Sequence, residues 1–405
     1  MPETNTVSAR SPAVAVVGAG PAGLTAAITL AAAGVPTVLA GQRPGDNRTT
    51  ALLAGSVTAL ETLGVWPYCA DHAAPLRTMR IVDDTGRLLR APEVKFDATE
   101  IGLDAFGQNI ENRHLLAGLA EQARTLKDLT WIEDRVESVA TDSYGATVTF
   151  ADGKAFAVPL VIGADGRNSL CRSAAGIPVE THRYPQSALT VCLSHGRPHH
   201  DISTEIHTAN GPFTLVPLPG QRSSLVWVMD PARAETIADL NDDELATDIE
   251  RQSQAILGKI KVDPGRGLFP LTMTRAQRFA DNRIALIGEA AHVIPPIGAQ
   301  GLNLGLRDAA SIGELVVDAW RGRRDPGADR LLADYDRQRR ADVGSRAFAI
   351  DLLNRSLLSD FLPVQGARGL GLYLIDRIGP LRRALMREGV APAASQPRLM
   401  RGHAL

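Results

Sequence analysis

Cysteine is scarce in this 405-residue sequence, and its spacing excludes two common kinds of stabilising site. The three cysteines, Cys69, Cys171 and Cys192, lie far apart and form no Cys-x-x-Cys pair. Zinc signatures and disulfide frameworks both depend on regularly spaced cysteines. We therefore predict no metal site, and the isolated thiols are typical of a reducing, cytoplasmic environment.

An excess of basic charge and long apolar runs are also missing. Lys and Arg number 43 against 45 Asp and Glu, a formal charge of −2, which argues against a nucleic-acid-binding protein. No apolar run reaches the roughly 18 to 20 residues that a membrane-spanning helix needs. Residues 1–12 lack the charged-then-apolar order of a signal peptide, so we expect a short disordered lead-in there.

The sequence does contain a glycine-rich motif typical of dinucleotide binding. Apolar residues 13–17 run into GAGPAG at 18–23, apolar residues then recur at helical spacing, and a second strand is predicted at 37–39. In this setting the first glycine permits a tight turn, the second lets the backbone approach a pyrophosphate, and the third allows helix and strand to pack closely. The predicted phosphate site comprises Gly18, Gly20, Pro21, Ala22 and Gly23.

One part of this motif is absent. The second strand is expected to end in Asp or Glu, which binds the ribose hydroxyls, but Gly41 occupies that position. Gln42 and Asp46 are the alternatives for the ribose contact. A disulfide reductase is excluded because the sequence has no close cysteine pair.

Two later segments each end a predicted apolar strand with an acid. One reads VIGADGRNS at 161–169; the other reads GEAAH at 288–292 and is followed by PIGAQGLNLGLRDA at 296–309. Together with GAGPAG, and in this order, they resemble the para-hydroxybenzoate hydroxylase-like (class A) FAD-dependent monooxygenases, most closely the ubiquinone-biosynthesis hydroxylase branch. Further stretches that carry the resemblance over nearly the whole chain are 48–52, 111–113, 211–219 and 381–389.

The resemblance implies an α/β fold. It would contain a Rossmann-like FAD-binding domain, an inserted antiparallel-sheet substrate domain and a helical C-terminal region. The short apolar stretches at 189–193, 213–216 and 224–228 suit such a sheet. The expected division is 13–75, 105–180 and 281–326 for the FAD-binding domain, 76–104 and 181–280 for the substrate domain, and 327–405 for the C-terminal helices.

The resemblance also implies where FAD binds. Glu289 would face the ribityl chain, where the family usually has Asp, and Pro295, Pro296 and Gly298 would run along the isoalloxazine. A helix beginning near Leu302 and Asn303 would direct its positive end at the N1–C2=O edge, where the reduced flavin carries negative charge. The further contacts implied are Gln300 and Gly301 at that helix, Arg48 and Asp165 near the phosphates, Arg113 near the ribityl or pyrophosphate region, and Val136 at the adenine.

Several of these residues have an ordinary structural alternative. Arg48 also fits a solvated loop, and Arg113 fits the surface of an amphipathic helix, although a cation there opposes the helix dipole. The helix from Leu302 onward fits core packing as well as cofactor binding. For His292 we favour a hydrogen-bonded structural histidine over a base.

The activity implied is hydroxylation of an aromatic ring. NAD(P)H would reduce FAD, O2 would form a flavin C4a-hydroperoxide, and one oxygen atom would pass to a ubiquinone-precursor phenol, with or without a prenyl tail. NAD(P)H would bind transiently, because the sequence has no second GxGxxG unit. No catalytic base is predicted, because the protein would mainly exclude water and position the ring, and no side chain is indispensable to that chemistry. His199, His200 and Asp201 follow Pro198 and are typical of an exposed loop.

Other functions remain open at this point. A hydroxylase of another phenol or of a polyketide keeps the same fold. A non-catalytic flavin-binding member of a biosynthetic complex is suggested by Gly41 and Glu289, which depart from the family pattern. A flavin halogenase is disfavoured because the four tryptophans are isolated from one another.

The C-terminal region contains a basic amphipathic pattern. Leu374, Ile378, Leu381 and Leu385 recur at helical spacing with arginines between them, and Gly379-Pro380 interrupts the run. Residues 372–390 could lie on the inner face of a membrane, where a lipid-tailed substrate would be found. We favour the alternative, in which this helix packs on the protein's own body.

Overall fold

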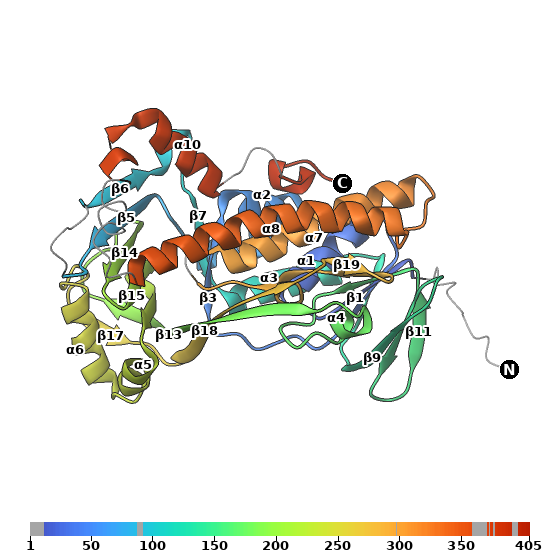
Figure 1. Cartoon of the computed structure of the whole chain (residues 1–405), viewed down its shortest axis with the longest axis horizontal. Coiled ribbons are helices and arrows are strands. Elements are labelled where there is room, and N and C mark those ends of the chain that lie inside the picture. Colours follow the sequence, from blue (N-terminus) through green and yellow to red (C-terminus); the bar gives the residue numbers. More distant parts are fainter. Residues whose placement is uncertain are drawn as a thin grey trace.

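The computed structural model describes residues 12–86, 92–296, 298–358, 371, 373–375, 377–390 and 396–405. The expected lead-in therefore lies outside the described residues, apart from Pro12. Two regions lie side by side along the long axis of the molecule, and helix α8 (Asp329–Leu358) extends across both (Figure 1). The mixed α/β architecture and the helical C-terminal region are as predicted.

The first region is built on a six-stranded, mainly parallel sheet. Its order is β19-β20-β12-β1-β2-β8, and only the short β19 is antiparallel to its neighbour. All residues of β1 and β12 are buried, which explains their continuous apolar sequence, because both faces of a parallel sheet are covered. The strands are β1 (Val14–Val17), β2 (Thr37–Ala40), β8 (Leu129–Ile132), β12 (Leu160–Gly163), β19 (Ala280–Asp281) and β20 (Ile284–Leu286).

Helix α1 (Pro21–Ala32) packs against β1, β2 and β8 of this sheet, and helices α3 (Asn112–Arg124) and α7 (Gln300–Arg321) both pack against α1. A Cβ on Gly313 of α7 would lie 2.5 Å from Cγ2 of Thr29 on α1, so the two helices approach too closely there for a larger residue. Their buried faces join the sheet in one large hydrophobic core.

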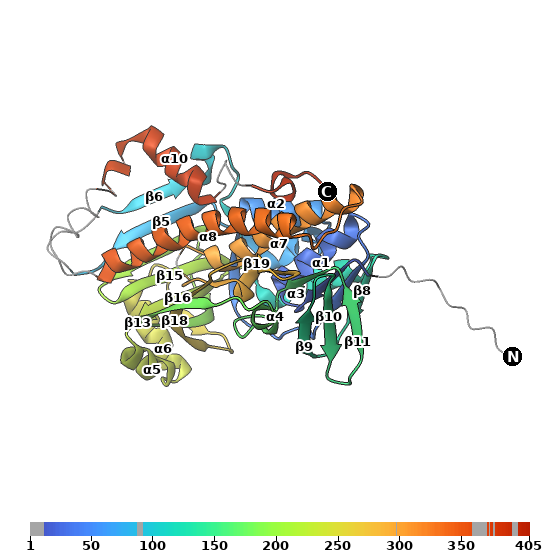
Figure 2. The same cartoon turned by 45° about the vertical axis from the view of Figure 1, so that its right-hand side comes forward.

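The second region is a nine-stranded sheet with a smaller core of its own. It is mainly antiparallel, as predicted, but β14 and β5 pair in parallel. Figure 2 shows α5 (Pro231–Ala238) and α6 (Asp242–Gln252), which the sequence did not predict, below the sheet and α8 above it. Its strands are β5 (Thr78–Asp83), β6 (Val94–Asp97), β13 (Val179–His195), β14 (Ile202–Thr208), β15 (Gly211–Leu218), β16 (Arg222–Met229), β17 (Ile260–Val262), β18 (Gly267–Ala276) and β21 (His292–Val293).

Smaller elements complete the first region and the junction. Strands β3 (Thr49–Leu53), β7 (Gly107–Glu111) and β4 (Ala73–Pro75) form one small sheet, and β9 (Val136–Thr141), β10 (Ala146–Phe150) and β11 (Ala155–Val158) form another. Short helices follow at α2 (Ala54–Thr62), α4 (Leu170–Ala174) and the 3-10 turn η4 (Gly288–Ala290).

The C-terminal part continues with α10 (Gly379–Val390) and the 3-10 turn η5 (Arg398–Arg401). The predicted interruption at Gly379-Pro380 is present, because α10 begins at Gly379. Among the described residues, no helix combines the length and the apolar character needed to cross a bilayer.

Candidate dinucleotide-binding site

The GAGPAG turn joins β1 to α1, and its three glycines are in different surroundings. Gly18 has φ +108, and a Cβ there would collide with the carbonyl oxygen of Ala164; a Cβ on Gly23 would collide with the carbonyl oxygen of Gly18. A Cβ on Gly20 would meet nothing within 4 Å. Packing therefore requires glycine at 18 and 23 but not at 20, where the open backbone fits a ligand that approaches closely.

Three segments far apart in the sequence converge at this turn. A Cβ on Gly288 of η4 would lie 3.2 Å from Cβ of Ala22 on α1, and one on Gly305 of α7 would lie 3.2 Å from Cα of Gly288. Helix α1 is preceded by Gly20 and α7 by Ala299, and neither residue supplies a side-chain cap. Two helix N-termini with uncapped N–H groups suit an anionic ligand such as a dinucleotide.

The turn before α7 differs in detail from the prediction. The helix begins at Gln300, two residues before Leu302, and Ala299 has a left-handed φ of 54. Pro296 and Gly298 are exposed, whereas Pro295 is buried. No atom would lie within 4 Å of a Cβ on Gly298 or Gly301, so this turn leaves room for a flat group.

Asn303 has no free side-chain group for a cofactor. Its Oδ1 accepts hydrogen bonds from the N–H of Leu53 (2.8 Å) and Oγ of Ser56 (2.7 Å). Its Nδ2 donates to the carbonyl oxygens of Ala51 (2.8 Å) and Ala299 (2.6 Å). This buried amide fastens α7 to β3 and α2, so any contact with a ligand must come from the Asn303 backbone.

Glu289 lies in an exposed group of charges that we call the groove cluster: Glu289, Arg48 and Arg167. Arg167 Nε donates to Glu289 Oε2 at 3.1 Å, and Arg48 Nη1 lies 3.8 Å from Glu289 Oε1. The structure thus brings together two predicted residues, Arg48 and Glu289, with Arg167, which the sequence reading missed although it belongs to the GADGRNS segment.

The acids near the predicted ribose and pyrophosphate contacts already have partners. Asp46 accepts from Arg48 and, at 2.9 Å, from Nδ2 of Asn112; burial raises the pKa of Asp46, but the bonds from Arg48 outweigh this and hold it below its usual value. Asp165 accepts from Oγ of Ser169 (2.6 Å) and the N–H of Cys171 (3.0 Å). Gln42 is exposed.

The glycine found in place of the ribose-binding acid has a conformational cause. Gly41 has φ +141, and a Cβ there would lie 3.3 Å from the N atom of Ala19 in the phosphate turn. Its carbonyl oxygen also accepts a hydrogen bond of 3.0 Å from Nε1 of Trp131. A side chain at this position would press against the turn.

Arg113 and Val136, the two remaining predicted contacts, lie on different elements, α3 and β9. Arg113 is exposed in the first turn of α3 and pairs with Glu111 at 2.7 Å; Glu111 also pairs with Arg222 of the second sheet at 2.9 Å. The N–H of Asn112 donates to the carbonyl oxygen of Arg48 at 2.8 Å, which sets Arg113 beside the groove cluster. Val136 begins β9 and is buried.

His292 is a buried, hydrogen-bonded histidine, as we favoured. Its Nε2 lies 2.7 Å from Oδ2 of Asp308 on α7, and Oδ1 of Asp308 accepts from Nε of Arg339 on α8 at 2.7 Å. Burial raises the pKa of Asp308, but His292 and Arg339 outweigh it and hold the carboxyl below its usual value. His200 and Asp201, with φ of 52 and 57, lie in the turn between β13 and β14.

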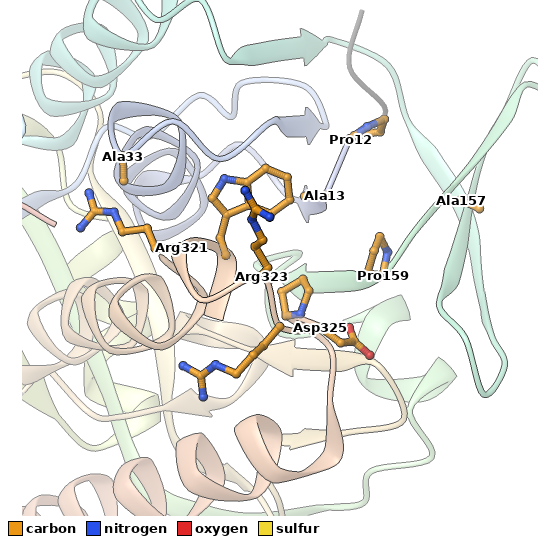
Figure 3. Close-up of a pocket in the computed structure, with 11 residues that line it drawn as sticks. Pro12, Ala13, Ala33, Ala157, Pro159, Arg321, Arg323 and Asp325 are labelled. Carbon is orange, nitrogen blue, oxygen red and sulfur yellow. The ribbon is translucent and has the colours of Figure 1, made fainter. Parts of the chain in front are cut away.

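A pocket of about 830 Å³ opens at the other end of α7. Figure 3 shows Arg321, Arg323 and Asp325 among its lining residues, together with Pro12 and Pro159. The 22 residues of α7 span about 30 Å at ~1.5 Å per residue, so this pocket is remote from the GAGPAG turn. Within the described ranges, no group of three or more His, Cys, Asp or Glu side chains could hold a metal ion.

Comparisons with known proteins agree with this geometry. Residues 11–348 match the model of a family described as FAD binding domain. The chain is 34% identical over 401 residues to ubiquinone hydroxylase UbiL of Rhodospirillum rubrum, covering 96% of this chain and 92% of that protein. It is 29% identical to 3-demethoxyubiquinol 3-hydroxylase of Escherichia coli, covering 92% and 97% of the two chains.

Solved structures show the same fold at lower identity. p-Nitrophenol 4-monooxygenase PnpA of Pseudomonas putida superposes with a TM-score of 0.76 at 20% identity, over 93% of this chain and 97% of that one. HpxO of Klebsiella pneumoniae, solved with FAD and uric acid, gives 0.75 at 20% identity, over 95% and 97%.

Proposed function

This chain belongs to the FAD binding domain family and is an FAD-dependent monooxygenase of the ubiquinone hydroxylase type; from this premise we propose that it uses NAD(P)H and O2 to hydroxylate a ubiquinone-precursor phenol. The observation that carries the proposal is the convergence of Ala22, Gly288 and Gly305 between two uncapped helix N-termini. The named relatives support the substrate class, with 34% identity over almost the full length of both chains.

Bound FAD supplies the redox and oxygen chemistry, and the protein binds it, orients it and excludes water. We propose that the open backbone at Gly20 and the first turn of α1 hold the pyrophosphate, with Gly18, Pro21, Ala22 and Gly23 shaping the turn. Glu289, Arg48 and Arg167 would border the ribityl and phosphate groups. Remaining proposed contacts are Gln42 at the ribose, Arg113, Val136, Asp165, the turn Pro295, Pro296 and Gly298, and the start of α7 at Gln300, Gly301, Leu302 and Asn303.

The domain division given above is likewise a proposal, and the separate hydrophobic cores of the two regions support it. The substrate would bind where the second sheet meets the first region. There Nδ2 of Asn109 on β7 donates to the carbonyl oxygen of Pro217 on β15 at 2.8 Å. NAD(P)H would bind transiently rather than on a Rossmann domain of its own.

Hydroxylation is tested with the purified, FAD-loaded protein. We expect a yellow protein whose NAD(P)H oxidation rises when a demethoxyubiquinol or a related prenylated phenol is added, with one oxygen atom gained by the product in mass spectrometry. Turnover only with unrelated phenols or polyketides would favour another hydroxylase. FAD binding with no turnover of any phenol would favour a non-catalytic member of a biosynthetic complex.

The phosphate site can be tested at Gly20 with two variants of equal size. Asp and Asn are both good N-cap residues, so Gly20→Asp and Gly20→Asn should both leave α1 at least as stable as before. Only Asp places a negative charge beside the proposed pyrophosphate, which at an effective dielectric near 20 costs a few kcal/mol. We expect Gly20→Asp to weaken FAD binding at least tenfold more than Gly20→Asn; equal affinities would contradict this placement.

We also propose a peripheral membrane contact at the C-terminal helix, on the cytoplasmic side. Leu374 and Ile378, which precede α10, and Leu381 and Leu385 within it are 38% to 46% exposed. Another face of α10 packs on the protein, with Met386 and Val390 buried. Packing on the protein's own body, the alternative that we favoured, involves that second face. Arg377, Arg383 and Arg387 are exposed around the apolar stripe, which suits an anionic lipid surface.

Vesicle flotation tests this contact. The protein should float with vesicles that contain anionic lipid, and a Leu381→Glu, Leu385→Glu double variant should not. Phe348→Glu on α8 is a matched control, because Phe348 is an exposed apolar residue on another helix. Equal flotation of all three proteins, or no flotation of the unaltered one, would end the membrane proposal without affecting the hydroxylation proposal.

A further inference from the structure

A buried charge network lies behind the flavin-facing segment 288–303 and connects it to α8. The members of this network are Asp308 and Arg307 on α7, and Arg339, Asp342 and Arg346 on α8. Arg339 Nη1 and Arg307 Nη1 donate to Oδ2 of Asp342 at 2.7 and 3.0 Å. Arg346 Nε donates to Oδ1 of the same carboxylate at 3.1 Å. All five side chains are almost completely enclosed, Arg346 the least so.

The network holds the flavin-facing segment at both ends. At the first end, Asp308 Oδ2 accepts from the N–H of Gly288 at 3.0 Å and lies 2.7 Å from Nε2 of His292. At the second end, Arg346 Nη1 donates to Oε1 of Gln300 at 3.3 Å, and Gln300 Nε2 donates to the carbonyl oxygen of Gly298 at 3.1 Å. A single set of ion pairs between α7 and α8 therefore supports both the start of η4 and the start of α7.

The network contains more positive than negative groups. Three guanidinium groups face two carboxylates, and Arg does not lose its proton in proteins. Burial would raise the pKa of Asp342, but Arg339 and Arg307 outweigh it and lower that pKa to about 2, so both carboxylates are ionised at neutral pH. Arg307 Nε and Arg339 Nη2 are buried with no hydrogen-bond partner among the described residues. One uncompensated positive charge thus lies in a region of low dielectric, where it is poorly screened.

We propose that Arg346 is a positioning residue for the flavin-facing turn, and that the excess positive charge of its network favours the reduced, anionic form of bound FAD. This inference rests on the FAD site of the proposed function but not on its substrate. Arg346 acts through Gln300 on the backbone that would border the flavin. The positive charge of Arg346 and the positive N-terminal end of the α7 dipole would both stabilise negative charge on the reduced flavin.

The experiment separates charge from position with two variants and a control on the same helix. Arg346→Gln removes the charge and the guanidinium, Arg346→Lys retains the charge alone, and Arg340→Gln alters an exposed arginine whose partner, at 2.9 Å, is Asp336. The midpoint potential of bound FAD and the hydrogen exchange of amides 298–303 are measured for each holoprotein, and exchange also for the FAD-free protein.

For Arg346→Gln we expect reduced FAD to lose about tenfold in affinity relative to oxidised FAD. For a two-electron couple this is a potential about 30 mV lower. Amides 298–303 should exchange several-fold faster in both Arg346 variants, with the potential retained in Arg346→Lys. The control should change in neither measurement.

If the midpoint potential of Arg346→Gln equalled that of the control, the network's charge would not favour reduced FAD. If the hydrogen exchange of amides 298–303 were unchanged, Arg346 would not position the turn. Neither measurement requires hydroxylation. If the proposed substrate proved wrong, this inference would therefore be unaffected. If the protein took up no FAD, the proposed function would be wrong, and hydrogen exchange in the FAD-free protein would still test whether Arg346 positions the turn.

Discussion

Two groups of arginines and carboxylates contact segment 288–303 or include one of its residues, and they differ chiefly in their access to water. In the groove cluster, Glu289 is 43% exposed and its partners Arg48 and Arg167 are 45% and 46% exposed. In the buried network, Asp308 and Arg339 are 0% and 2% exposed. Water and salt screen the first group, so its pairs contribute little to stability and can exchange partners with a ligand. The second group cannot relax in this way, and loss of one member leaves an uncompensated buried charge.

The largest effect that would sharpen this comparison is expected from Asp308→Asn. This variant leaves Arg339 with one carboxylate instead of two and removes the charge that accepts from Gly288. Breaking a buried pair in this way costs about 3 to 5 kcal/mol. Urea unfolding of the FAD-free protein measures the cost.

Glu289→Gln is the matched comparison for that experiment, because it removes one carboxylate charge from the exposed group. Its cost should stay below about 1 kcal/mol. If both variants were equally stable, the distinction between the two groups would fail.

An effect of intermediate size on stability is expected when Asp342 is protonated at low pH. The pKa of Asp342 is lowered from 3.8 to about 2 in the folded protein, so its stabilising contribution is complete above the unfolded value and is lost as the pH falls toward the folded one. Since a difference of one in pKa corresponds to 1.36 kcal/mol, Asp342 contributes about 2 kcal/mol to the free energy of unfolding at neutral pH. Unfolding midpoints measured from about pH 5 downward should fall more steeply for the unaltered protein than for Asp342→Asn. If the two proteins lost stability in parallel as the pH fell, the arginines would not lower the pKa of Asp342.

The smallest effect concerns FAD affinity at the groove cluster. Removing the negative charge in Glu289→Gln leaves Arg167 without its carboxylate partner and Arg48 with Asp46 alone, so the site becomes more positive and FAD should bind a few-fold more tightly. Arg167→Gln should bind it a few-fold less tightly. Both differences should disappear at ~1 M salt, where the Debye length is ~3 Å. Differences that survive in high salt would mean that these residues act by shape rather than by charge.

The same contrast explains which parts of the site the sequence could predict. The GAGPAG turn follows from local rules, since Gly18 and Gly23 are required by the backbone around them, and the segments that end in Asp165 and Glu289 follow predicted strands. The buried network follows no local rule. Only the apolar residues of α7 indicate in the sequence which face of the helix is buried, so the burial of Asp308 could not be predicted. Its partner Arg339 is 31 residues further along the chain.

Other differences also depend on tertiary context. Helix α7 begins at Gln300 because Ala299 adopts a left-handed φ. The sequence does not specify this conformation, since Gly298 and Gly301 on either side of Ala299-Gln300 could also adopt it. Asn303 was expected near the cofactor because of its position in the motif. Its side-chain amide satisfies groups of β3 and α2, which are some 250 residues away in the chain, so only its backbone is available to a ligand.

The last turn of the chain, η5, ties the C-terminal segment to the first region. Leu399 and Met400 are buried in the core of the first region, and Arg398 pairs with Glu314 and Asp318 of α7. These contacts therefore hold η5 against the last turns of α7, at the opposite end of that helix from Gln300. Shortening the chain to study the C-terminal helix would remove these contacts, so single substitutions are the better tool for dissecting that region.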